Sequence, residues 1–178
     1  NRIERIGSPF GDLYKTRNGI ATLKNNIFIL NLINEDDAFY YLNNEKEFKI
    51  EKGICANIIN PNRFTKINNV EEVIKKIIFP YQFVEGKVEL ISEEYFQNTY
   101  PFAYDYLKSK KDILRLRDKE KGKYENWFAY GRNQSLEKMR NKLFFPHITP
   151  DIPNFVINTD ENLLFHNGLA VVTENERE

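Results

Sequence analysis

Cysteine is almost absent from this sequence, and its scarcity excludes several classes of protein. The single Cys55 cannot form an internal disulfide, and it cannot supply the paired thiolates of a cysteine-based zinc site. One lone thiol is typical of a reducing compartment, so we expect a cytoplasmic protein. No run approaches the roughly 18 apolar residues of a membrane span, and no secretory signal is present, so we expect no membrane partner.

Glycine is also scarce, and the 8 glycines are scattered rather than gathered into a loop for phosphate or S-adenosylmethionine. Candidate catalytic residues are few. Cys55 lies in an apolar run typical of a small buried side chain, and His147 and His166 lack the spacing of a zinc pair. Residues 45–49 (EKEFK) fit part of a metal-dependent nuclease pattern, but such matches arise by chance in a chain rich in lysine and glutamate. The sequence therefore predicts a chain with no catalytic residues, metal or cofactor of its own.

Hydrophobic residues make up 41% of the 178 residues, which is enough for the core of one folded domain. Short β-prone runs come first: a strand, turn and strand at 11–33, a hairpin around 43–45, and an aromatic strand at 77–83 that pairs with 87–91. The turn in the first of these is expected at Arg17-Asn18-Gly19, where glycine can take a positive φ.

A helical middle follows these strands. Ser92 is placed to cap a helix, and apolar residues at helical spacing predict a second helix over 102–119. A strand at 142–148 and a final hairpin at 155–172 close the chain. This order predicts an α+β fold of mostly antiparallel strands and hairpins with a helical middle segment.

Charge is unevenly distributed, although the net charge is zero. Residues 108–142 hold 12 Lys/Arg and 5 Asp/Glu, which gives +7 there and leaves −7 for the remainder. Such asymmetry is typical of a protein that binds an anionic partner, above all nucleic acid. A solvated lysine-rich helix would produce the same count.

The segment 125–137 (ENWFAYGRNQSLE) contains side chains that could read DNA. Arg132 can pair with guanine, and the amides of Asn133 and Gln134 can pair with adenine. Trp127 and Tyr130 are expected to support this segment as aromatic residues, although both would serve equally well in a core.

Phosphate contacts are expected from cations on either side of this segment and from one hydroxyl. Ser135 could donate to phosphate or cap a helix over 135–142. The full set of predicted backbone contacts is Lys111, Arg115, Lys119, Lys142, Ser135 and Arg17.

Several stretches, taken in order, resemble one known family. They are KTRNGIATLKNNIFI, FKIEKGICANIINPNRF, KIIFPYQ, YPFAYDYLKSKKDILRLRDKEKGKYENWFAYGRNQSL and KLFFPHIT followed by PNF and LFHNGLAVV. Their order resembles the TaqI-like C-terminal specificity domain. This is the target recognition domain of many N6-adenine DNA methyltransferases and of fused type II restriction-modification enzymes.

The resemblance implies that residues 1–178 are a DNA target recognition domain cut from a longer methyltransferase chain, an expectation that the initial Asn1 also favours. Its partners would be double-stranded DNA and an N-terminal methyltransferase domain of the same chain. That domain would bind S-adenosylmethionine and carry the catalytic Asn/Asp-Pro-Pro-Tyr/Phe motif, from which residues 60–63 (NPNR) and 79–81 (FPY) both depart. Two other hypotheses remain: a protein- or RNA-interaction module, and a metal-dependent nuclease.

Overall fold

The computed structural model describes residues 7–44, 46–65, 69–120, 124–149 and 154–173. They form an α+β fold of mostly antiparallel strands with short helices, which confirms the predicted fold class. None of the helices in these ranges is long and apolar enough to cross a membrane.

The largest sheet brings together strands from both ends of the sequence. In spatial order its strands are β1 (Lys15–Asn18), β12 (Leu169–Thr173), β9 (Asn141–Phe145) and β10 (Val156–Asn158). All of its pairings are antiparallel. The strand predicted at 142–148 is confirmed only as far as Phe145, where β9 ends before Pro146. The prediction of a final hairpin is wrong, because β9 lies between β10 and β12 and pairs with both.

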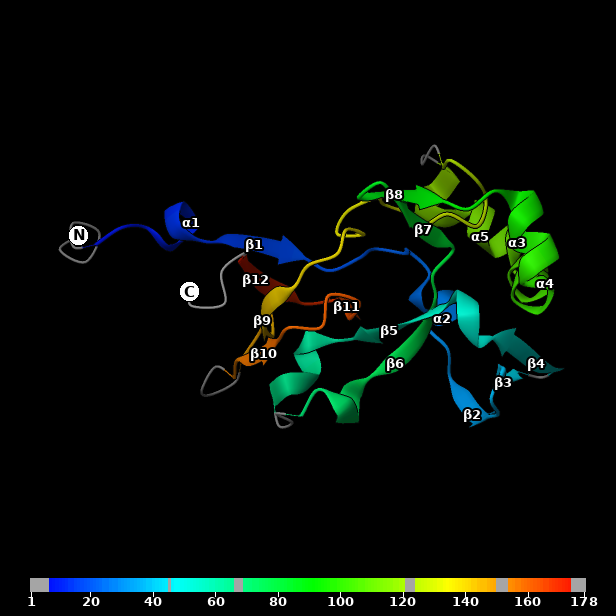
Figure 1. Cartoon of the computed structure of the whole chain (residues 1–178), viewed down its shortest axis with the longest axis horizontal. Coiled ribbons are helices and arrows are strands. Elements are labelled where there is room, and N and C mark those ends of the chain that lie inside the picture. Colours follow the sequence, from blue (N-terminus) through cyan, green and yellow to red (C-terminus); the bar gives the residue numbers. More distant parts are fainter. Residues whose placement is uncertain (1–6, 45, 66–68, 121–123, 150–153, 174–178) are drawn as a thin grey trace.

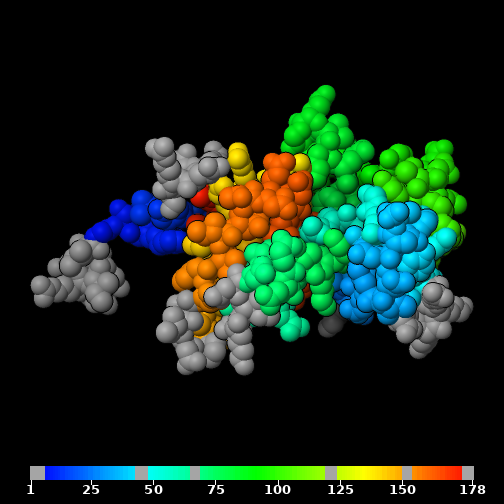
Figure 2. Space-filling view, turned by 60° about the horizontal axis from the view of Figure 1, so that its bottom comes forward, coloured from blue at the N-terminus to red at the C-terminus, as the bar shows by residue number. Residues whose placement is uncertain are grey.

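A second sheet contains β11 (Leu164–Phe165), β5 (Cys55–Ile59) and β6 (Lys75–Ile78). β5 pairs with β6 antiparallel and with β11 parallel. This parallel pairing occupies the segment that was expected to turn back as a hairpin. On the face seen in Figure 2, the green segment before β6 lies against the orange segment around β10 and β11.

The other strands form local structures. β2 (Leu32–Glu35), β3 (Phe39–Asn44) and β4 (Lys46–Glu51) make a three-stranded sheet, and β7 (Tyr81–Val84) pairs with β8 (Lys87–Leu90). The hairpin predicted around 43–45 is confirmed as β3 and β4, although Glu45 itself lies outside the described residues. The strand predicted at 77–83 is wrong as one element, because it is divided before Tyr81 between β6 and β7, and only β7 pairs with β8.

The prediction for residues 11–33 is wrong in detail. The short helix α1 (Phe10–Leu13) precedes β1, and α2 (Asn25–Phe28) occupies part of the expected second strand. Arg17 and Asn18 lie within β1 rather than in a turn, because they pair with β12.

Although α1 lies beside β1 of the four-stranded sheet, the longer helices lie at the opposite end of the molecule (Figure 1). They are α3 (Glu93–Thr99), α4 (Pro101–Ser109) and α5 (Lys111–Arg115), and the 3-10 turns are η2 (Lys52–Ile54), η3 (Pro61–Thr65), η4 (Glu71–Val73) and η5 (Arg117–Glu120). The predicted cap is confirmed, since Ser92 Oγ accepts from the Tyr95 N–H at 3.1 Å. The single helix over 102–119 is interrupted at Lys110 and Leu116, so its cations do not form one regular stripe.

Two hydrophobic clusters form the core. The larger one includes Phe28, Phe96 and Phe128 and joins the helices to β3–β8. The smaller one lies beside the four-stranded sheet, where the rings of Phe144 and Phe165 are 5.2 Å apart. The segment 125–137 connects the two regions, which is why its placement determines the candidate site.

Candidate nucleic-acid interface

The aromatic residues of the segment 125–137 lie inside the fold. Tyr130 is 1% exposed, and its hydroxyl donates to the Ile78 carbonyl at 2.6 Å. Trp127 is half-buried, and its Nε1 donates to the Glu93 carboxylate at 2.8 Å, which is the main reason that the pKa of Glu93 is lowered. These two aromatic residues therefore support the loop from beneath and do not offer two open faces for base stacking.

Arg117 fixes the backbone that leads into this loop. Its side chain is buried, and its Nε donates to the Leu114 carbonyl at 2.7 Å. The two terminal nitrogens donate to the carbonyls of Ala129 and Trp127 at 2.5 and 2.9 Å. Its guanidinium also lies 4.4 Å from the ring centroid of Tyr124, and burial lowers its pKa. One cation thus organises the end of the helical region and the start of the loop.

Residues 131–135 form a polar loop that is fastened to residues 18–22. Four hydrogen bonds join the two segments: Gly131 N–H to the Thr22 carbonyl (3.2 Å), Arg132 N–H to the Ala21 carbonyl (3.1 Å), Gln134 Nε2 to the Gly19 carbonyl (2.8 Å) and Ser135 Oγ to the Asn18 carbonyl (2.5 Å). Two of them are backbone bonds and two use loop side chains. The polar loop therefore has a defined path along the surface.

The three predicted base-contacting residues are all exposed on the polar loop. The side chains of Arg132 and Asn133 make no hydrogen bond to any residue that the structure describes. Gln134 uses one Nε2 hydrogen for the Gly19 carbonyl and retains its Oε1 and a second hydrogen. The loop thus presents a guanidinium and two amides to the outside.

Two predicted phosphate contacts are corrected by the structure. Lys142 is 2% exposed, because its Nζ donates to the Met139 carbonyl and, at 2.6 Å, to the Asp160 carbonyl. Ser135 is also buried, and its hydroxyl donates a hydrogen bond to the Asn18 carbonyl. Its φ of 55° is incompatible with the helix expected over 135–142, and the following residues are extended or irregular up to β9.

The remaining predicted phosphate contacts differ in accessibility. Arg115 is exposed on α5, and Arg17 is exposed on β1, where it makes a 3.6 Å ion pair with Glu137. Lys111 is half-buried, with its Nζ 4.7 Å from the ring centroid of Trp127. The side chain of Lys119 lies outside the described residues.

Burial of Lys142 predicts a pH dependence of stability. Desolvation lowers the pKa of Lys142 from 10.5 to about 8, so between these values the unfolded chain binds more protons than the folded one. Stability must therefore rise with pH across this window. We expect the wild type to gain about 2 kcal/mol relative to Lys142→Met between pH 8 and about pH 10, measured by urea unfolding at each pH. Parallel curves for the two proteins would contradict this burial.

Catalytic chemistry has little support among the described residues. Burial raises the pKa of the Cys55 thiol to about 12, so a thiolate nucleophile is disfavoured. No group of three His, Cys, Asp or Glu side chains in the described ranges is placed to hold a metal ion. In the nuclease-like stretch, Lys49 Nζ instead lies 4.5 and 4.0 Å from the ring centroids of Phe39 and Phe102.

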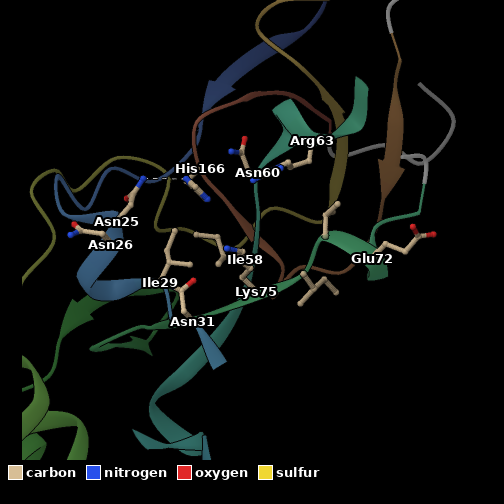
Figure 3. A pocket seen from close by; sticks show the side chains of 12 residues that line it. Asn25, Asn26, Ile29, Asn31, Ile58, Asn60, Arg63, Glu72, Lys75 and His166 are labelled. Carbon is tan, nitrogen blue, oxygen red and sulfur yellow. Dashed lines mark hydrogen bonds between the residues drawn. The ribbon is translucent and has the colours of Figure 1, made fainter. Parts of the chain in front are cut away.

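One feature that the sequence did not reveal is a polar pocket of about 410 Å³, shown with its lining residues in Figure 3. Its wall includes Asn60 and Arg63 from one segment, Lys75 from β6, and His166 from the residues after β11. The only sequence signal was a local abundance of asparagine near residues 25 and 60, which is common throughout this chain.

Comparisons with known proteins do not assign a family. No protein-family model matches the sequence, and a search of curated proteins finds no match.

Proposed function

We propose that this chain recognises a specific sequence in double-stranded DNA through the polar loop of residues 131–135. The observation that carries the proposal is the joint exposure of Arg132, Asn133 and Gln134 on a loop held by four hydrogen bonds. A guanidinium pairs with guanine, and side-chain amides pair with adenine. Because the loop backbone is already fastened, less conformational freedom is lost when these groups meet a base edge.

Phosphate contacts would hold the duplex against the polar loop. Arg17 is well placed for this role, since its partner Glu137 follows the loop closely in sequence and the ion pair is solvent-exposed. Exposed ion pairs contribute at most about 1 kcal/mol, so Arg17 can exchange Glu137 for a phosphate at little cost. Arg115, and to a smaller extent the half-buried Lys111, would add sequence-independent attraction from α5.

The resemblance to TaqI-like specificity domains extends this proposal to a parent enzyme. The chain would be the target recognition domain of an adenine-specific DNA methyltransferase, or of a restriction-modification enzyme that contains one. A separate N-terminal domain would bind S-adenosylmethionine and receive the flipped adenine. The contribution of this chain would be to hold the duplex in register.

The test begins with selection of bound duplexes from a randomised DNA library, followed by fluorescence anisotropy on the selected site and a scrambled one. Arg132→Ala should reduce the free-energy difference between the two sites by about 1–3 kcal/mol, because it removes a bidentate base contact. Arg115→Ala should weaken binding to both sites equally. It should also reduce the slope of log affinity against log salt concentration by about one, because one phosphate contact is lost. Equal effects of the two variants would contradict the separation of base reading from phosphate binding.

The alternative hypotheses give different results in the same assays. Binding of single-stranded RNA without binding of duplex DNA would favour an interaction module. Metal-dependent DNA cleavage that is lost on substitution of Glu45, Glu47 or Lys49 would favour a nuclease. Failure to enrich any duplex sequence would remove the proposed function.

A further inference from the structure

Thr22 joins the polar loop to a buried part of the fold. It is 0% exposed, and its carbonyl accepts from the Gly131 N–H at 3.2 Å. The neighbouring Ala21 carbonyl accepts from the Arg132 N–H at 3.1 Å. These two backbone bonds set the position of Arg132, the residue proposed to read a base. A shift of Thr22 would therefore be transmitted to the base-reading end of the loop.

The side chain of Thr22 belongs to a chain of hydrogen bonds that ends at His166. The Lys24 N–H donates to Thr22 Oγ1 at 3.0 Å, and Thr22 Oγ1 donates to Asn25 Oδ1 at 2.6 Å. Asn25 Nδ2 lies 3.2 Å from His166 Nδ1, the contact dashed in Figure 3. Because an amide nitrogen can only donate, Nδ1 accepts, and the neutral ring carries its proton on Nε2. Each donor in this chain thus has an acceptor.

His166 gives this chain of hydrogen bonds a fixed end. It is 9% exposed, and its backbone N–H donates to the Ile59 carbonyl of β5 at 3.0 Å. Burial lowers the pKa of His166 to about 4, so its imidazole is neutral at neutral pH and can accept at Nδ1. The Phe165 carbonyl accepts from the Ile20 N–H at 2.8 Å. The segment 18–22 is therefore anchored by its backbone at one end and by a side chain at the other.

We propose that Thr22, Asn25 and His166 are positioning residues, which set the conformation of the polar loop for sequence reading by contacts inside the fold. The inference rests on the proposed function of the polar loop and identifies what holds its base-reading end in place. Without the Asn25 amide, the buried Thr22 hydroxyl would lose its acceptor and His166 Nδ1 would lose its donor. Buried polar groups without partners are costly, so the backbone around Thr22 would move to regain hydrogen bonds. Gly131 and Arg132 would move with it, because they are bonded to that backbone.

Two substitutions of Thr22 separate hydrogen bonding from packing. Thr22→Ser keeps the hydroxyl and removes the methyl group, whereas Thr22→Val keeps the shape and removes the hydroxyl. In fluorescence anisotropy on the selected and scrambled duplexes, Thr22→Ser should discriminate like the wild type. Thr22→Val and Asn25→Ala should each reduce the ratio of the two Kd values by about tenfold. Asn26→Ala is the matched control, because Asn26 is exposed on the same helix α2 and its side chain forms no hydrogen bond with the described residues.

Amide hydrogen exchange followed by NMR tests the same residues without DNA. Thr22→Val and Asn25→Ala should each speed exchange of the Gly131 and Arg132 N–H groups by about tenfold, because a buried hydrogen bond is lost. Thr22→Ser should retain the wild-type rates. The double variant Thr22→Val/Asn25→Ala should exchange no faster than the faster single variant, since both changes break one chain of hydrogen bonds. Unchanged rates in α4 exclude global unfolding as the cause.

The tautomer of His166 gives a spectroscopic test of the last contact. Long-range proton–nitrogen spectra should place the proton of the neutral wild-type ring on Nε2, because Nδ1 accepts from Asn25. In Asn25→Asp, a proton should be found on Nδ1, because a carboxylate can only accept. A proton on Nδ1 in the wild type would contradict the chain of hydrogen bonds, even if one of the variants failed to fold.

Failure of this proposal and failure of the proposed function give different results. If the wild type selects no duplex, the proposed function is wrong, and exchange of the Gly131 and Arg132 amides decides whether the chain of hydrogen bonds positions the loop. If the wild type discriminates and Thr22→Val behaves like Thr22→Ser, packing holds the loop and the proposal is wrong. Unchanged amide exchange in both Thr22→Val and Asn25→Ala would also overturn it.

Discussion

Replacement of Arg117 by leucine is expected to lower the free energy of unfolding by about 3–5 kcal/mol. The guanidinium donates to the carbonyls of Leu114, Trp127 and Ala129 from a position that is 1% exposed. Leucine would leave these acceptors without their donors, and a buried unsatisfied group costs about 1–3 kcal/mol. The backbone before the polar loop would lose its main connection to the helical region.

Urea unfolding followed by circular dichroism measures this effect. Arg115→Leu is the matched control, because Arg115 is exposed on α5 only two residues away, and its loss should stay within about 0.5 kcal/mol. Arg117→Lys should fall between the two, since one ammonium cannot reproduce the planar fork that serves three carbonyls. If Arg115→Leu and Arg117→Leu destabilise equally, Arg117 does not organise the backbone that leads into the polar loop.

The second large effect is expected from Gly19→Ala, at about 3 kcal/mol of lost stability. A Cβ at this position would lie 2.4 Å from the Phe165 carbonyl oxygen and 2.6 Å from His166 Cα. Both atoms belong to the backbone, so they cannot rotate away as a side-chain end can. The chain would have to separate where Ile20 N–H donates to the Phe165 carbonyl at 2.8 Å.

The same substitution should disturb the polar loop and the wall of the pocket. The Gly19 carbonyl accepts from Gln134 on the polar loop, and the backbone that Cβ would displace includes His166 in the pocket. We therefore expect weaker discrimination between DNA sites, in addition to a lower urea midpoint.

Two glycine variants serve as controls for this prediction. Gly11→Ala meets nothing within 4 Å and should be close to neutral. In Gly131→Ala the new Cβ would lie 2.3 Å from the Leu23 side chain, which is 38% exposed and can move, so a smaller loss is expected. An unfolding free energy for Gly19→Ala no lower than that for Gly11→Ala would contradict the close backbone packing at Gly19.

Local signals in the sequence predicted the elements whose causes are also local. Ser92 caps α3 because its hydroxyl reaches an N–H three residues away, and β3 pairs with β4, the next strand along the chain. The side chains of Arg132 and Asn133 are exposed, as expected for long or polar side chains. Composition and periodicity were sufficient for these features, because each depends on neighbours within a few residues.

Features that depend on distant partners could not be read in this way. A lysine is expected at the surface, yet Lys142 is buried, because the Met139 and Asp160 carbonyls accept hydrogen bonds from its Nζ. Ser135 looked like a helix cap, yet the Asn18 carbonyl lies within reach of its hydroxyl and its φ is positive. In both cases the competing acceptor is a backbone carbonyl whose position only the folded chain sets.

The sequence by itself determined an α+β chain of short antiparallel strands, with a helical middle and an exposed run of guanidinium and amide groups. Only the tertiary structure decided the order of the strands, the burial of Lys142, and the meeting of Arg63, Lys75 and His166 around one pocket. Hydrophobic patterning specifies which face of an element is buried. Patterning does not specify which other element covers that face, because the free energy of burial depends on the apolar area and not on the identity of the partner.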